Sequence, residues 1–237
     1  MSITTIQSRA GNFTSSQIYK LMTNDRKGTG IGSAGLTYIN QKRREAKLGR
    51  QLQSEINTHA ITWGKFLQHR VTNVLLDIGC KPTKDIRRIH PLISNWTGAE
   101  DYLRDDAIGE VKCFELDNFT FTHDCATAGY ETLREECPDI FWQLVSNAIL
   151  CDKPKAELVL YVPYQSELSA IREEAESIDD HRFSWIKFAS DDEMPYLIQG
   201  HHYPNLSKFT CNIPESDRLA LTNRVLMAVK MLGEFKK

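Results

Sequence analysis

The stretch GAEDYLRDDAIGEVKC in the middle of the chain places charged side chains among apolar ones. We read it as two short strands, 98–104 and 108–114, joined by a turn at Asp-Asp-Ala, which suits a hairpin. Side chains alternate along a strand, so Glu110 and Lys112 are predicted to point to the same face. A hairpin would also bring Asp101 back beside them, which gathers two anions and one cation on one small surface.

The charged residues of this stretch have two interpretations. Carboxylates near a turn are usually solvated, and a Glu-x-Lys pair on one strand face is usually a surface ion pair of little energetic weight. The apolar neighbours Val111, Cys113 and Phe114 indicate instead that the second strand is buried, where Glu and Lys are rare unless paired or bound to metal. Mg²⁺ and Mn²⁺ prefer oxygen ligands, often one or two carboxylates with water. A lysine beside them can orient a water or stabilise charge on a phosphate.

Length and composition bound the fold class and the compartment. The chain has 237 residues, of which 41% are hydrophobic, and shows no internal repeat or second domain boundary, so we expect one domain over residues 1–237. No apolar run approaches the roughly 20 residues of a membrane-spanning helix. The first residues lack the basic-then-apolar pattern of a secretory signal. We therefore expect a cytosolic protein with no membrane partner, whose six cysteines are reduced thiols.

Positive charge is concentrated near the start of the chain. Residues 1–50 carry nine Lys and Arg against two Asp and Glu, whereas residues 113–237 carry 12 basic and 21 acidic residues. This distribution suits a nucleic-acid surface on one side of the protein. The segment 36–49 reads as a helix with four exposed basic residues, Lys42, Arg43, Arg44 and Lys47. This helix could either contact phosphate or simply be solvated. The Gly/Ser-rich loop 24–35 could either contact DNA or be a plain linker.

A second candidate site lies at the start of the chain. Ser15 and Ser16, after Thr14, precede an apolar segment and read as a helix N-cap. A helix N-terminus offers free backbone N–H groups and the positive end of the helix dipole, and so can hold an anion. Arg9 lies nearby in the sequence. On these residues alone, a plain N-cap with an unrelated surface arginine is the more ordinary interpretation.

Taken together, the motifs resemble the PD-(D/E)xK nuclease superfamily. Asp101, Glu110 and Lys112 match its D…E-x-K pattern. Within the superfamily, the run RAGNFTSSQIYKLM from Arg9 is similar to the N-terminal motif of the lambda-exonuclease-like, or YqaJ-type, viral recombinases, which include the phage alkaline exonucleases. Gln143, in the predicted helix 138–150, matches their glutamine helix. The resemblance covers about residues 7–163, with the motifs in family order, and leaves 164–237 as a C-terminal extension.

The resemblance implies a fold and a set of catalytic roles. It implies an α/β fold with a central mixed β-sheet flanked by helices and a restriction-endonuclease-like core. Asp101 and Glu110, with the carbonyl of Val111, would bind Mg²⁺ or Mn²⁺, in a site that holds two ions in the family. Lys112 would position or activate the attacking water, and Gln143 would reach the active site.

The resemblance also implies a substrate and partners. Arg9 and Ser16 would bind the 5′-phosphate of a DNA end, with Ser15 as a neighbour. The implied activity is a 5′-to-3′ exonuclease on duplex DNA for phage-type recombination in a bacterial host cell. Enzymes of this kind form ring-shaped homotrimers and work with a single-strand-annealing protein.

Two positions depart from the family pattern. Glu100 stands directly before Asp101, where the family usually has a proline. Gln68 stands where the G-x-x-x-E motif has a metal-binding glutamate, in the predicted helix 58–77. An amide brings no negative charge, so the second metal ion should bind more weakly. Two alternatives stay open. The first is an endonuclease or nickase on the same fold. The second, suggested by Gln68, is a DNA-binding protein with impaired catalysis.

The remaining segments receive simpler predictions. We expect His123 to be a partly buried or surface histidine without a catalytic role. The strands are predicted at 85–91, 119–123, 156–162 and 181–189. Further helices are predicted at 166–177 and 213–237.

Overall fold

The computed structural model describes residues 10–52, 58–72, 80–83 and 86–233. Its main sheet has five strands in the order β2-β5-β6-β7-β8, and β6 and β7 are parallel while the other pairs are antiparallel. The strands are β2 Lys81–Pro82, β5 Tyr102–Leu103, β6 Ala107–Lys112, β7 Lys155–Tyr161 and β8 Leu206–Asn212. A smaller sheet has the order β1-β4-β3, with β1 Phe13–Thr14, β4 Trp96–Gly98 and β3 Arg88–Ile89. The mixed sheet predicted from the resemblance is confirmed.

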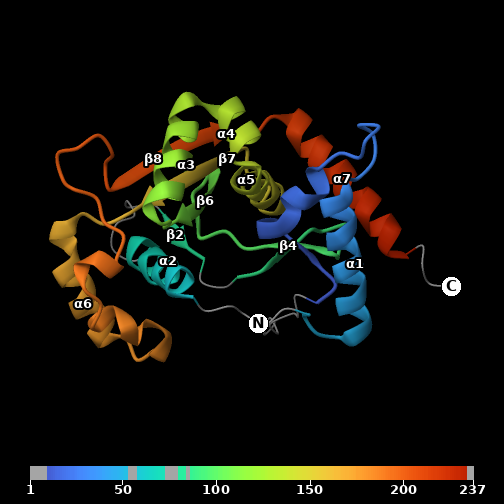
Figure 1. Cartoon of the computed structure of the whole chain (residues 1–237). Coiled ribbons are helices and arrows are strands. Elements are labelled where there is room, and N and C mark those ends of the chain that lie inside the picture. The colour runs from blue at the N-terminus through green and yellow to red at the C-terminus, as the bar shows by residue number, and fades with distance from the viewer. Residues whose placement is uncertain (1–9, 53–57, 73–79, 84–85, 234–237) are drawn as a thin grey trace.

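Helices cover both faces of the main sheet (Figure 1). The α-helices are α1 Ser33–Leu48, α2 His59–Arg70, α3 Leu116–Ala128, α4 Tyr130–Glu136, α5 Pro138–Leu150, α6 Leu168–Ser177 and α7 Glu215–Gly233. The 3₁₀ helices are η1 Ser15–Met22, η3 Gln165–Glu167, η4 His181–Lys187 and η5 Asp191–Glu193. Among the described residues, we find no helix long and apolar enough to cross a membrane.

The two faces of the sheet carry separate apolar cores. Along β6, Ile108 packs into a core shared with η1, α1, α5 and α7, whereas Val111 packs against α2 and α6 on the opposite face. The alternation of a strand therefore sends neighbouring residues of β6 into different layers. Any polar side chain on β6 must find its partners within the layer that it enters.

Helix α5 lies in the middle of the first core, between the sheet and the N-terminal helices (Figure 1). It begins with Pro138 in its first turn, a position that needs no backbone N–H donor. All residues from Ile140 to Ala148 are buried, so the helix is buried on every side. Close packing extends to Gly98 of β4, where an added Cβ would lie 2.1 Å from Ser15 Oγ and 2.4 Å from Asn147 Oδ1.

Helix α2 is held at both ends by the C-terminal part of the chain. Trp185 Nε1 donates to Thr62 Oγ1 at 2.9 Å near the start of the helix. Arg70, its last residue, pairs with Glu174 and lies 3.5 Å from Glu167. The position of α2 against the sheet therefore depends on residues beyond 163.

Two predicted strands are helices in the structure. Residues 119–123 lie inside α3, where Phe119, Thr122 and Cys125 are buried at helical spacing. The short alternation of Phe and Thr was therefore misread as a strand. Residues 181–189 contain η4, which begins where the Asp180 side chain accepts from Arg182 N at 2.9 Å. The strand β8 was not predicted.

Most other elements fall where the sequence places them. The helices predicted at 36–49, 138–150, 166–177 and 213–237 correspond to α1, α5, α6 and α7, and the strand at 156–162 corresponds to β7. The predicted helix 58–77 is present as α2, and residues 73–77 lie outside the described part. Of the strand predicted at 85–91, only Arg88–Ile89 pairs as β3, and residue 85 is not described.

Candidate active site

Asp101 lies at the junction between the two sheets. The chain leaves the small sheet after β4 and enters the main sheet at β5, so the predicted strand 98–104 is two strands with Asp101 between them. Asp101 N donates to Gly109 O at 2.9 Å. Its Oδ2 accepts from Val111 N at 2.7 Å. Burial raises the pKa of the Asp101 carboxyl, although the hydrogen bond from Val111 acts against this rise.

Glu110 is buried in the middle of β6 and faces α5. Lys112 Nζ donates to its Oε1 at 2.9 Å, and Gln143 Nε2 donates to the same oxygen. Asn147 Nδ2 donates to the other oxygen, Oε2, at 3.1 Å. The pKa of Glu110 is raised to about 7, mainly by burial; Lys112 opposes this rise, and the charge of Asp101 adds to it. The prediction that Glu110 and Lys112 share a face is confirmed.

Lys112 connects Glu110 to Gln143. Its Nζ lies 2.9 Å from Glu110 Oε1 and 2.9 Å from Gln143 Oε1. Burial alone would lower the pKa of this lysine, but the charge and hydrogen bond of Glu110 outweigh burial and raise it. The surroundings of Lys112 therefore favour its ammonium form, which donates to both Glu110 and Gln143.

Gln68 approaches the same site from the opposite layer. It lies on α2, and its Nε2 donates to Asp101 Oδ1. The Gln68 side chain thus contacts Asp101, one of the two carboxylates of the D…E-x-K motif. In the absence of a charge at this position, the amide satisfies one oxygen of Asp101 by a hydrogen bond.

A cleft of about 510 Å³ opens beside these residues. Helix α2 forms one wall, and the end of β6 with the start of α3 forms the other. The lining residues are Ala60, Ile61, Gly64, Lys65, Gln68, residues 110–115 and Asn118. Glu110, Lys112 and Gln68 are therefore accessible to a ligand that enters between α2 and α3.

The donor set suits a hard divalent cation. Asp101 and Glu110 supply carboxylate oxygens, and the charge of Asp101 contributes to the raised pKa of Glu110, so the two groups repel each other. A cation between them would relieve this repulsion. Among the described residues, no three or more His, Cys, Asp and Glu side chains gather into a metal site. Two carboxylates completed by carbonyl, amide and water oxygens match the coordination of Mg²⁺.

The two serines of the predicted 5′-phosphate site have different surroundings. Ser15 is 2% exposed, and its Oγ lies 2.8 Å from Ser146 Oγ on α5. Ser16 is exposed at the start of η1, and Arg9 lies outside the described residues. The expected cap is absent, because Thr14 precedes η1 without a side-chain capping bond. Ser16 therefore remains available to a ligand, while the Ser15 hydroxyl is used in internal packing.

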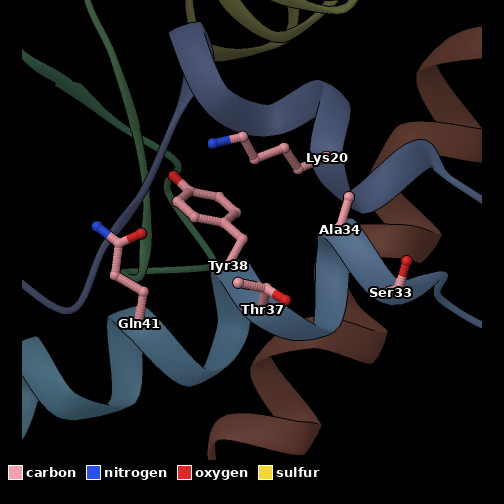
Figure 2. A pocket seen from close by; sticks show the side chains of 6 residues that line it. All are labelled: Lys20, Ser33, Ala34, Thr37, Tyr38 and Gln41. Atoms are coloured by element: carbon pink, nitrogen blue, oxygen red, sulfur yellow. The ribbon is translucent and has the colours of Figure 1, made fainter.

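A second hollow lies between η1 and α1 (Figure 2). Its volume is about 350 Å³, and it is lined by Lys20, Ser33, Ala34, Thr37, Tyr38 and Gln41. Burial and the nearby charge of Lys42 lower the pKa of Lys20, whose ammonium lies over the Tyr38 ring at 5.5 Å. Ser33, Thr37 and Gln41 present hydroxyl and amide groups to the same space.

The prediction that Lys42 is exposed was wrong. It is buried, and its Nζ pairs with the buried Glu45 at 2.8 Å. Arg43 is half-buried and donates to Met231 O at 2.8 Å, whereas Arg44 and Lys47 are exposed, as predicted. Helix α1 therefore offers fewer exposed basic groups to phosphate than its sequence indicates.

Two further polar residues, Asn147 and His123, can be compared with what the sequence predicted. Asn147 was not identified from the sequence, although its position four residues after Gln143 in an apolar helix is the signal that could have found it. His123 is half-buried, as expected, and packs among the aromatic rings of Phe119, Tyr203 and Phe209.

Comparison with known proteins places the fold. No protein-family model matches the chain, and no curated protein matches it. Among solved structures, the chain is similar to two crystal structures of LHK-Exo, an alkaline exonuclease from Laribacter hongkongensis, one of which is a complex with dAMP. Each has 17% identity and a TM-score of 0.62, over 94% of this chain and 89% of that chain.

A phage related exonuclease from Haemophilus somnus 129PT is similar at 14% identity and a TM-score of 0.64, over 93% of each chain. Identities this low establish the fold and leave the chemistry to be argued from the site. The chain has the mixed α/β fold of these exonucleases along nearly its whole described length.

Proposed function

We propose that this protein is a metal-dependent DNA exonuclease that degrades duplex DNA from 5′ ends. The observation that carries the proposal is that Glu110 and Lys112 line one cleft and are both held by Gln143. Asp101 accepts hydrogen bonds from two residues that line the same cleft, Gln68 and Val111. The similarity to exonuclease structures supports it. The direction of cleavage, the recombination role and the cytoplasmic location rest on the sequence resemblance.

The roles of the residues follow from their contacts. Asp101, Glu110 and the Val111 carbonyl would hold Mg²⁺ or Mn²⁺, which when bound supplies Lewis-acid polarisation of the phosphate and a more acidic water. Lys112 is charged and donates hydrogen bonds, so it would orient the attacking water or stabilise negative charge on the phosphate. Gln143 Oε1 accepts from Lys112 and fixes the direction of its ammonium group.

A second ion would have a poorer site. Gln68 donates to Asp101, where the family motif supplies another carboxylate. A site at Gln68 therefore offers one negative charge fewer, which weakens binding of a divalent cation. We propose that the enzyme works with one firmly bound ion and a second, weaker one.

End recognition belongs to the same proposal. Ser16 is exposed at the start of η1, and Arg9 precedes it. We assign the 5′-phosphate to Arg9 and Ser16, and we assign Ser15 the role of anchoring η1 to α5. A homotrimer around DNA and a single-strand-annealing partner are also proposed, on the resemblance alone.

One observation favours a second candidate function. The Gln68 amide already satisfies an oxygen of Asp101, so the site is stable without a metal ion at that position. A DNA-binding protein with impaired catalysis would show this feature. It would retain salt-sensitive DNA binding and would lack Mg²⁺-dependent cleavage.

The deciding experiment is digestion of linear duplex DNA, with and without a 5′-phosphate, in Mg²⁺ or Mn²⁺. A Lys112→Ala variant runs alongside. Digestion that requires the 5′-phosphate and disappears in the variant supports the exonuclease. If the unaltered protein binds DNA and digests neither substrate, and Gln68→Glu fails to restore activity, the binding function replaces it.

A further inference from the structure

Asn147 joins the two segments that carry the carboxylates. It is 1% exposed, in the third turn of α5. Its Nδ2 donates to Glu110 Oε2 at 3.1 Å and to Ala99 O at 3.1 Å. Ala99 lies two residues before Asp101, in the segment between β4 and β5. One amide group therefore contacts the buried glutamate on β6 and the backbone that leads into Asp101.

Asn147 and Gln143 act on Glu110 from the same helix. Residues four apart lie on one face of an α-helix. Gln143 donates to Oε1 of Glu110, and Asn147 donates to Oε2. Both oxygens of the carboxylate are thus held by amide donors, which fixes the rotation of the carboxylate plane.

The orientation of the Asn147 amide is set by its surroundings. Reversing the amide would bring its oxygen against the Glu110 carboxylate and against the Ala99 carbonyl, where both contacts would be repulsive. In the observed orientation, Oδ1 is buried without a hydrogen-bond partner. An unpartnered buried oxygen is unfavourable. Asparagine at this position therefore carries a cost in stability, which its two donated bonds offset.

We infer that Asn147 is a positioning residue that holds Glu110 and the Ala99–Asp101 segment in the geometry that binds a divalent cation. The inference rests on the proposed metal-dependent function and extends it to a residue outside the D…E-x-K motif. Asn147 itself makes no contact with the cation. It acts by keeping the two carboxylates oriented toward a common point.

Ser146 provides a matched control. It precedes Asn147 on α5 and is 0% exposed. It also has two hydrogen-bond partners, Ser15 Oγ at 2.8 Å and Trp96 Nε1 at 2.8 Å. Its bonds point toward η1 and β4, away from the carboxylates. Loss of either side chain removes buried hydrogen bonds from the same helix, but only Asn147 touches Glu110.

The test is Mn²⁺ binding, followed by electron paramagnetic resonance without DNA. Asn147→Ala should weaken Mn²⁺ binding by about 10- to 100-fold, as expected for a residue that orients a metal ligand. Ser146→Ala should lower the melting temperature and leave Mn²⁺ affinity unchanged. Equal Mn²⁺ affinity in folded Asn147→Ala and unaltered protein, or equal losses in both variants, would overturn the inference. If the unaltered protein binds no Mn²⁺, the proposed function itself fails.

Two further measurements apply if Asn147→Ala does not fold. Asn147→Ser keeps a small polar group that is too short to reach Glu110, and it should show the same loss of Mn²⁺ affinity. In the unaltered protein, the side-chain amide protons of Asn147 should exchange slowly by NMR and shift when Mg²⁺ is added. Exchange at the rate of a solvent-exposed amide, or no shift with Mg²⁺ at saturation, would overturn the inference.

Discussion

A glutamate introduced at position 68, where the motif that the sequence resembles has one, should make the protein depend on metal for stability. In Gln68→Glu, a carboxylate replaces the amide that donates to Asp101 Oδ1. Two like charges about 3.5 Å apart repel by about 5 kcal/mol at an effective dielectric constant near 20. Protonating a carboxyl of ordinary pKa at pH 8 costs about 5 kcal/mol as well. We therefore expect a loss of up to about 5 kcal/mol in the free energy of unfolding at pH 8 without metal.

The sign of the pH dependence follows from linkage. The new carboxyl has a pKa that is higher in the folded protein than in the unfolded chain, because Asp101 opposes its charge. Stability relative to the parent is therefore lost as pH rises from about 4.3 toward the raised pKa. At pH 5, the deficit should fall to about 1 kcal/mol. Saturating Mg²⁺ or Mn²⁺ should remove most of the deficit at pH 8, because it binds the folded state alone.

Denaturant unfolding at pH 5 and pH 8, with and without metal, measures these differences. Gln68→Ala is the control, since it loses the same hydrogen bond and adds no charge. The double variant with Asp101→Asn should recover stability at pH 8, which isolates the repulsion between the two positions. A deficit that is equal at both pH values, or that persists with Asp101→Asn, would show that the two side chains do not face each other as described.

Three further predictions concern the site and the hollow. Lys112→Ala should lower the rate of single-turnover digestion by about 100- to 1000-fold while DNA affinity is retained, because its ammonium acts on developing charge. Since the pKa of metal-free Glu110 is about 7, protons compete with metal, so Mn²⁺ affinity should fall roughly tenfold per pH unit below 7; affinity independent of pH from 5 to 8 would contradict this. Lys20→Gln should weaken DNA binding and reduce the slope of log K against log salt by about 1, whereas an unchanged slope would place DNA elsewhere.

The sequence predicted the catalytic strand well because its signal is local. Glu110 and Lys112 share a face by the two-residue period of a strand, and Val111 marks the strand as buried. Helix α5 was equally clear, since its apolar run is long and begins with Pro138. In both cases, neighbouring residues alone determine the local structure.

Other features depend on packing between distant segments. The contact of Asn147 with Glu110 exists because α5 lies against β6, which no single stretch of sequence specifies. The Ser15 side chain points inward, although the sequence predicts that its hydroxyl caps a helix. Its Oγ contacts Ser146 Oγ and occupies space that a side chain at position 98 would fill. The sequence predicts that Lys42 is solvated, because its ion pair with the buried Glu45 depends on how α1 packs. The strand predicted at 119–123 was wrong for a different reason, because a five-residue alternation is too short to distinguish a strand from a helix.

The attachment of α2 has a consequence for how small a working enzyme can be. Thr62 and Arg70 are bound by Trp185, Glu167 and Glu174, none of which enters the cleft. A fragment ending at residue 163 would keep Asp101, Glu110, Lys112 and Gln143 and would lose both anchors of the helix that carries Gln68. A fragment that keeps the position of α2 should therefore extend at least through Trp185. Substitutions in this C-terminal part can then shift Gln68 relative to Asp101 without altering either residue.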